Sequence, residues 1–371
     1  MHPTASAPLI IRPRTVEEVA SAVQQHNSLH LVGSATKSAM SAPRGDAVRC
    51  ELTELSGVVE HQPSEFLITA LAGTRISELQ QTLAEHRQYF PFDPPFVDAG
   101  ATIGGTLAAG LSGPGRLRYG GIRDFVMGVR FVDGLGKVVT AGGRVVKNAA
   151  GYDIPKLLVG SCGYLGALVE VTLKVFPSPR HELTLRITAS DFQGAVNLQT
   201  MLARSPIELT ALDLAPEATL WVRISGELAA VEATAQRVQN AVAKLDPAAV
   251  VEPWQDADPV WRPLSDGSWL DSDDRLVRVP LPPVKLVELE RSLAETLVHR
   301  RYSVAGNLAW IRWPGARPLG QLDELLRYHG LGGSVLIGQC SRYRLGVRGN
   351  ATILDRIKRA LDPVGKFVGA P

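Results

Sequence analysis

The sequence predicts an α+β protein with two domains and a short C-terminal segment. Three observations predict this class. Strand and helix patterns alternate at the start of the chain, and glycine is concentrated between residues 100 and 166, which hold 17 of the 35 glycines. After Pro177 and Pro179, strand, helix and strand follow one another twice. We therefore expect domains at residues 1–178 and 179–345, then a helix and tail at 346–371.

The N-terminal segment predicts two helices, each next to a short strand. Thr15 can cap a helix because Glu18 follows three residues later, as in a capping box. The other expected elements are a strand at 30–32 that leads into the loop Gly33–Ser38, a strand at 66–71, and a helix with Ile76, Leu79 and Leu83 on one face.

The glycine-rich segment predicts loops and short strands. Residues 126–133 and 138–140 flank Gly134-Leu135-Gly136, which indicates a hairpin. Glycine weakens both helices and strands, so its density here needs a reason. One reason is a set of tight turns, and the other is backbone packed directly against a large ligand.

The second domain is expected to alternate strands and helices, with one irregular insertion. That insertion is residues 246–274, which are rich in Pro, Asp and Trp. The expected strands are 183–187, 221–224, 275–280 and 302–313, and the expected helices are 191–203, 227–245, 284–299, 319–328 and, beyond the domain, 351–361.

Composition excludes several classes of protein. The 39 Lys and Arg residues nearly balance the 37 Asp and Glu residues, which argues against a general polyanion binder. Cys50, Cys162 and Cys340 are too few for a four-cysteine cluster or zinc site within this chain. No apolar run reaches the ~18 residues of a membrane span, and no signal peptide is evident. We expect a cytoplasmic protein, with peripheral contact to the inner membrane through partners as an alternative.

Two loops have the composition of phosphate-binding backbone. In Gly33–Ser38 the small residues let the backbone approach a phosphate, successive N–H groups can form an anion-binding nest, and Lys37 adds a charge. In Ala101–Thr106 and Arg118–Asp124, two glycine pairs lie beside Thr, Arg and Asp, which suits a diphosphate and a polyol. Neither loop is a Rossmann or Walker fingerprint. Plain turns explain each loop taken alone.

A third motif reads Lys147-Asn148-Ala149-Ala150-Gly151-Tyr152-Asp153 and continues to Gly166. In this order, the three segments resemble the FAD-binding domain of the vanillyl-alcohol oxidase / para-cresol methylhydroxylase superfamily over residues 8–178. The version found here is similar to the FAD-binding E-subunit family of bacterial glycolate oxidases (glycolate dehydrogenases). The resemblance implies a two-subdomain FAD-binding domain with a smaller, ferredoxin-like α+β cap.

The resemblance also implies the residues that bind the cofactor. The segment Gly33–Ser38 matches the pyrophosphate loop, Ala101–Gly105 matches a second FAD-contacting loop, and a further segment passes beside the cofactor. Many superfamily members attach FAD through a histidine in the pyrophosphate loop, and none lies between Gly33 and Ser41, so we expect dissociable FAD. The implied contacts are Gly33, Ser34, Ala35, Thr36, Lys37, Ser38, Ala101, Thr102, Ile103, Gly104, Gly105, Tyr119, Gly120, Asp124, Val169 and Val171.

The implied function is the FAD-binding subunit of a multi-subunit glycolate oxidase, which passes electrons from the oxidation of glycolate to glyoxylate toward an iron–sulfur partner. The implied partners are a D-type flavoprotein subunit and an F-type iron–sulfur subunit. The alternatives are a stand-alone FAD-dependent 2-hydroxy-acid dehydrogenase and a non-catalytic assembly subunit. The six tryptophans all lie within residues 179–345, and they fit either an interface or core packing.

The sequence assigns no catalytic residue and no metal site. Related 2-hydroxy-acid enzymes carry an H-x-G-D-G-N-x-H-like segment, whereas residues 304–310 keep only Gly306 and Asn307 of it. Arg342, Arg344 and Arg348 stand at alternate positions, either as carboxylate binders or as a solvated basic face. The terminal Asp362–Phe367 resembles a family tail that folds back toward the FAD domain.

Overall fold

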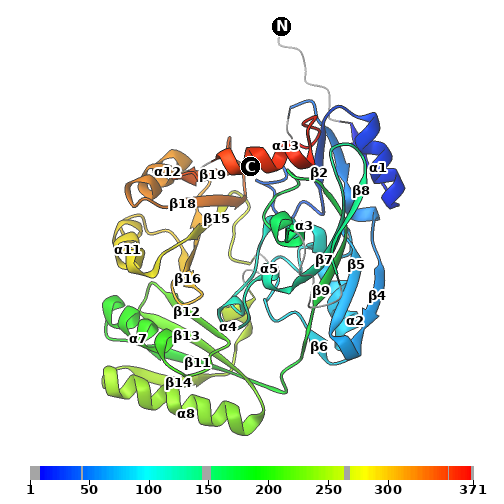
Figure 1. The fold of residues 1–371 in the computed structure, drawn as a ribbon. Helices are drawn as coiled ribbons and strands as arrows, with labels where there is room; N and C mark the ends of the chain where they lie inside the picture. Colours follow the sequence, from blue (N-terminus) through cyan, green and yellow to red (C-terminus); the bar gives the residue numbers. More distant parts are fainter. Residues whose placement is uncertain (1–8, 43–44, 144–151, 263–267, 350, 369–371) are drawn as a thin grey trace.

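The computed structural model describes residues 9–42, 45–143, 152–262, 268–349 and 351–368 (Figure 1). Two small sheets and a five-stranded sheet form the N-terminal part, and one nine-stranded sheet forms the cap. The cap sheet runs from His181 to Gly346, so we keep 1–178, 179–345 and 346–371 as the proposed divisions of the chain.

The chain begins with a parallel sheet of order β1(Ile10–Ile11), β3(Val48–Glu51) and β2(Leu29–Val32). The helix α1(Val16–Gln25) covers it through Val16, Val19 and Val23. Thr15 caps this helix as predicted, since its hydroxyl accepts a hydrogen bond from the Glu18 N–H at 3.1 Å. The Glu18 carboxylate accepts from the Arg14 N–H at 2.7 Å, one residue before the position that a capping box requires.

We expect Thr15→Ala to lower the free energy of unfolding by about 1 kcal/mol, because the first turn of α1 loses its side-chain acceptor. Chemical denaturation of the full chain measures the change. Thr82→Ala on α2(Ile76–Ala84) is the control, since the Thr82 hydroxyl only donates back to the Glu78 carbonyl. An equal loss in both variants would contradict the assignment of the cap.

The N-terminal domain is built around a five-stranded antiparallel sheet. Its strand order is β4(Val58–Gln62), β5(Leu67–Leu71), β9(Ala167–Lys174), β7(Val126–Val132) and β8(Val138–Gly142). Short helices lie beside it, namely α3(Ile103–Ala109), α4(Arg116–Tyr119), α5(Ile122–Phe125) and α6(Ile154–Leu158). A two-residue pair, β6(Gln88–Tyr89) with β10(Phe176–Pro177), closes the domain.

The prediction of loops and short strands after residue 100 is wrong for residues 103–109, which form α3. Thr102 caps this helix by accepting from the Gly105 N–H at 3.2 Å. A Cβ on Gly104 would lie 2.7 Å from the Cβ of Ala72. The glycine therefore lets α3 pack directly on the end of β5, a long-range contact that a local pattern does not reveal.

The nine-stranded antiparallel sheet consists of two ferredoxin-like halves. The first is β11(His181–Thr188), α7(Phe192–Arg204), β12(Ala211–Ala215), β13(Thr219–Gly226), α8(Leu228–Leu245) and β14(Val250–Trp254), in spatial order β14-β11-β13-β12. The second is β15(Arg275–Pro280), α11(Leu286–Ala294), β16(Arg300–Ser303), β17(Leu308–Trp313), α12(Leu319–Tyr328) and β18(Gly332–Ile337), in order β16-β17-β15-β18, with β19(Arg344–Gly346) at the edge. The predicted α+β cap is confirmed, and its topology is duplicated.

Three of the predicted cap elements are wrong in their extent. The strand expected at 302–313 is a hairpin, because Val304, Ala305 and Gly306 all have positive φ and turn the chain between β16 and β17. The expected insertion contains the edge strand β14, and the helix expected at 284–299 is the shorter α11. Strands β12 and β18 are not predicted at all.

One face of the cap sheet packs on its own helices and the other on the N-terminal domain. Figure 1 shows α7, α8, α11 and α12 on the side away from that domain. Val277 and Val279 of β15 lie in the helix-side core, whereas Leu276 lies in the core shared with the five-stranded sheet. Trp310 and Trp313 are fully buried, one on each face, so these two pack in the core.

The C-terminal helix α13(Ala351–Leu361) lies between the two parts (Figure 1). Its tail folds back on the N-terminal sheet, where the Leu29 N–H donates to the Lys366 carbonyl at 2.7 Å. Asp362 accepts from the Lys366 and Phe367 N–H groups, and Lys358 donates to Asp362. Phe367 is buried beside β2, so the described tail holds β2 in place ahead of the Gly33–Ser38 loop.

Candidate FAD-binding site

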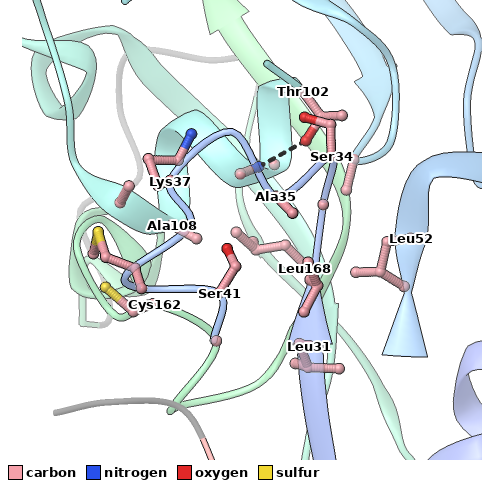
Figure 2. A pocket seen from close by; sticks show the side chains of 18 of the residues that line it. Leu31, Ser34, Ala35, Lys37, Ser41, Leu52, Thr102, Ala108, Cys162 and Leu168 are labelled. Carbon is pink, nitrogen blue, oxygen red and sulfur yellow. Dashed lines mark hydrogen bonds between the residues drawn. The ribbon is translucent and has the colours of Figure 1, made fainter. Parts of the chain in front are cut away.

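A narrow cavity of about 80 Å³ lies at the end of β2, between the Gly33–Ser38 loop and the N-terminus of α3 (Figure 2). Gly163, Gly166 and Leu168 form its other wall. Its volume suits a phosphate-sized group and not a whole dinucleotide. Met40, Ala109 and Cys162 also line a second cavity of about 610 Å³ between α5 and the cap sheet, so the two cavities adjoin.

The loop presents free backbone donors to the narrow cavity. Among the described residues, the N–H groups of Ser34–Lys37 donate no hydrogen bond to protein. Ala35 has φ = 57°, in the left-handed region that disfavours any residue other than glycine. Left-handed backbone beside right-handed backbone turns successive N–H groups to one side, which is the arrangement of an anion nest. The structure thus holds a strained loop with its donors unused.

Gly33 and Thr102 bring the loop against α3. A Cβ on Gly33 would lie 2.6 Å from the Thr102 hydroxyl oxygen, and one on Gly105 would lie 2.9 Å from it. That hydroxyl is occupied as the cap of α3. Glycine at both positions therefore lets two chain segments and the helix end converge on one small volume.

Lys37 places a buried positive charge beside this cavity. Its side chain is 7% exposed, and its Nζ donates to the Thr36 hydroxyl at 2.9 Å and lies 5.5 Å from the Phe96 ring centroid. In the part of the chain that the structure describes, no carboxylate pairs with it. Burial lowers the pKa of Lys37 to about 8. An anion in the cavity would supply the missing partner.

The second cavity carries arginines on both of its walls. Arg116 and Arg123 come from α4 and α5, whereas Arg278 and Arg344 come from the cap sheet. Of these four, the sequence analysis named Arg344 and, within the Arg118–Asp124 segment, Arg123. Arg342 pairs with Asp323, and exposed Arg348 lies beyond the end of β19. Alternation along one strand could identify Arg344, but the arginines of α4 and α5 meet those of the cap sheet only when the cap folds onto the first domain.

The structure brings half of the predicted site residues together around the narrow cavity. These are Gly33, Ser34, Ala35, Thr36, Lys37, Thr102, Gly104 and Gly105. Ser38 lies at the cap instead, where its hydroxyl accepts from the Gly338 N–H at 3.0 Å. Ala101 and Ile103 are buried behind the cavity and bond to neighbouring backbone.

The remaining predicted residues lie away from the narrow cavity. Tyr119 packs edge-on against Phe176, and Gly120 has φ = 87° beside Asp124. Asp124 accepts from the Gly121 N–H at 2.8 Å and lines the second cavity. Val169 and Val171 are buried in β9, and Leu168 between Ala167 and Val169 is the β9 residue that lines the narrow cavity. Their contacts with FAD stay predictions.

Residues 147–151 of the third motif lie outside the described residues. Its described continuation supplies Cys162, Gly163 and Gly166 to the cavity wall, which the predicted contacts omitted. Cys162 has φ = 50°, so the chain turns sharply there. Among the described residues, no group of three or more His, Cys, Asp or Glu side chains is placed to hold a metal ion.

Residues 7–142 match a family described as "FAD binding domain". Over these residues the chain is similar to an FAD binding domain. The match spans both the Gly33–Ser38 loop and the Thr102 helix cap, the two segments that converge on the narrow cavity. The predicted cofactor, FAD, is confirmed at the level of the domain.

Curated relatives of this chain are oxidase subunits and dehydrogenases by name. Glycolate oxidase subunit GlcE of Escherichia coli (strain K12) is 38% identical over 221 residues, which are 59% of this chain and 61% of that protein. D-lactate dehydrogenase of Anaerostipes hadrus is 28% identical over 51% of this chain and 40% of that protein. Glycolate oxidase subunit GlcD of Bacillus subtilis (strain 168) is 27% identical over 45% of this chain and 36% of that protein. The chain thus spans about two fifths to three fifths of these relatives' lengths.

Two solved structures of alkyldihydroxyacetonephosphate synthase are similar in fold to almost the whole of this chain. Both have a TM-score of 0.72, cover 96% of this chain, and are 17% and 16% identical to it. The aligned regions cover 74% and 75% of those chains. At this identity the likeness concerns the fold alone, and it agrees with the predicted fold class, an FAD-binding domain with an α+β cap.

The residues of the FAD binding domain fit the cofactor's chemistry. The free N–H groups of Ser34–Lys37 and the Lys37 ammonium suit a diphosphate, and the second cavity has the size of an ordinary ligand pocket, able to take a flat ring system. When bound, FAD would supply a two-electron acceptor. Among the described residues, no helix combines the length and apolar composition of a membrane span.

Proposed function

We propose that this chain is the FAD-binding subunit of a multi-subunit glycolate oxidase, and that it passes electrons from 2-hydroxy-acid oxidation toward an iron–sulfur partner. The observation that carries the proposal is the adjacency of the two cavities, one with free N–H donors and Lys37 and one lined by arginines. The first suits a diphosphate, and the second suits a ring beside a small carboxylate. The names of two curated relatives, both glycolate oxidase subunits, support the same proposal.

The proposed partners are a D-type flavoprotein subunit and an F-type iron–sulfur subunit. Oxidation of a hydroxy acid to a keto acid releases two electrons and two protons, whereas iron–sulfur clusters accept electrons singly. The three cysteines of this sequence are too few for a four-cysteine cluster. A separate iron–sulfur chain is therefore the relay that the proposal needs, and contact with the membrane would come through such partners.

Eleven of the sixteen predicted contacts have a role in this proposal. The residues around the narrow cavity bind the diphosphate, with Lys37 neutralising part of its charge. Ala101 and Ile103 hold the second loop in place through backbone hydrogen bonds. Asp124 orders the turn at Gly121 on the edge of the second cavity. Because the loop carries no histidine, we propose that FAD binds without a covalent link.

Purification of the tagged full chain from its own cells tests this proposal. We expect a visible flavin spectrum, release of the flavin by acid, and co-purification of a second flavoprotein and an iron–sulfur protein. A colourless chain that takes up no added FAD would overturn the proposal and favour an assembly subunit. A yellow chain that purifies alone and oxidises glycolate with a dye acceptor would instead favour the stand-alone dehydrogenase.

A further inference from the structure

The cap wall of the second cavity carries a row of polar side chains across three strands. Arg278 of β15 pairs with Ser334 of β18, and Ser334 pairs with Arg344 of β19. Directly paired residues of antiparallel strands point to the same face of a sheet. Trp310 pairs with Arg278 on its other side and lies in the core shared with the N-terminal domain. This row therefore faces the N-terminal domain, across the cavity from Arg116 and Arg123.

Arg278 is a partly buried guanidinium without an anionic partner. Among the described residues, neither Arg278 nor Arg116 makes a side-chain hydrogen bond or ion pair. Burial, together with the nearby charge of Arg116, lowers the pKa of Arg278 to about 10. The group therefore stays charged at neutral pH. Two unpaired like charges at one cavity are costly unless an anion enters between them.

The charge of the cavity exceeds what one carboxylate would neutralise. Its described lining holds four arginines and one carboxylate, Asp124, which gives a net charge of +3. Asp124 already accepts from the Gly121 N–H. Arg278 is the least exposed of the four arginines, and Arg116, Arg123 and Arg344 are exposed at the edge. A single carboxylate on Arg278 would leave this edge without a counter-charge.

We propose that the second cavity binds an organic anion with two carboxylate groups, one held by Arg278 and the other by the exposed arginines. This inference rests on the proposed function, because the FAD ring would share this cavity, and it adds a dicarboxylic ligand to the monocarboxylic glycolate that the proposed function names. Guanidinium groups on both walls can each make charge-assisted, paired hydrogen bonds to a carboxylate. A cavity of about 610 Å³ has room for such an anion beside a flat ring.

Calorimetric titration of the FAD-loaded full chain with malonate and with acetate tests the inference, because neither probe can be oxidised at a hydroxyl. We expect malonate to bind at least tenfold more tightly than acetate, and Arg278→Gln to weaken malonate binding about tenfold or more. Arg204→Gln, at the exposed end of α7, is the control and should leave malonate binding unchanged. Equal binding of the two probes, or unchanged malonate binding in Arg278→Gln, would overturn the inference.

Two further measurements keep the result interpretable. The flavin content of each sample is measured first, so a chain without flavin counts against the proposed function, and a flavin-loaded chain that ignores malonate counts against this inference. Where Arg278→Gln does not fold, Arg116→Gln on the opposite wall takes its place, with the same expected loss of malonate binding. Arg278→Lys keeps the positive charge but removes the planar guanidinium group, so this variant should retain part of the affinity for malonate.

Discussion

Replacing Lys37 by glutamine is expected to weaken FAD binding by about ten- to a hundredfold. Lys37 is buried, it adjoins the free N–H groups of Ser34–Lys37, and no carboxylate among the described residues pairs with it. A hydrogen bond to a charged group contributes roughly 1.5–3 kcal/mol, which sets this range. Titration of the flavin-free full chain with FAD, followed by flavin fluorescence, measures the change.

The Lys37 contribution also predicts how FAD affinity depends on pH. Burial lowers the pKa of Lys37 to about 8 in the free chain, and a bound diphosphate would raise it again. The contribution is therefore complete below about pH 8 and is lost as pH rises toward the raised value. Wild type should bind FAD more weakly at about pH 9 than at about pH 7, whereas Lys37→Gln should show much less of this difference. The same pH dependence in both chains would show that another group is responsible.

Replacing Asp213 by asparagine is expected to destabilise the cap by about 3–5 kcal/mol. Asp213 of β12 is fully buried, and it accepts from the Arg301 Nε at 2.8 Å and the Ser303 hydroxyl at 2.7 Å. It lies where the two ferredoxin-like halves meet, a junction at which Leu214 and Tyr302 are the paired residues of the backbone ladder. Loss of its charge leaves the mostly buried Arg301 without its ion-pair partner. Denaturant unfolding of the full chain measures the loss.

A double variant separates the ion pair from simple packing at this junction. Asp213→Asn combined with Arg301→Met removes both charges, and we expect it to recover part of the stability that Asp213→Asn loses. Arg186→Met, whose side chain pairs with Glu252 on the edge of the same sheet, is the matched control and should have a small effect. A double variant less stable than either single variant would show that the charges do not act as a pair.

Local signals were sufficient for much of the fold and for the first half of the site. The Thr15 cap, the apolar face of α2 and the alternation in β11 all depend on residues a few positions apart, so the sequence displays them directly. The Gly33–Ser38 loop is visible for the same reason, since a short strand leads into small residues and a lysine.

Long-range contacts account for what the sequence did not reveal. The local sequence predicts that Gly104 lies in a loop. The close packing of Ala72 against Gly104 is a long-range contact that this pattern does not contain. Strand β12 has a charged residue, Asp213, in its middle, and its pattern makes sense only with Arg301 from the other half of the cap. The arginine-lined cavity likewise needs α4, α5 and the cap sheet together, and its four arginines lie too far apart in the sequence to form one motif.

The most direct test of the account is an experimental structure of the full chain with FAD bound. We predict the diphosphate within hydrogen-bond distance of the N–H groups of Ser34–Lys37, the Lys37 ammonium beside it, and the ring system in the cavity lined by Arg278. A structure with the diphosphate elsewhere, and with the Ser34–Lys37 N–H groups turned to solvent, would contradict it.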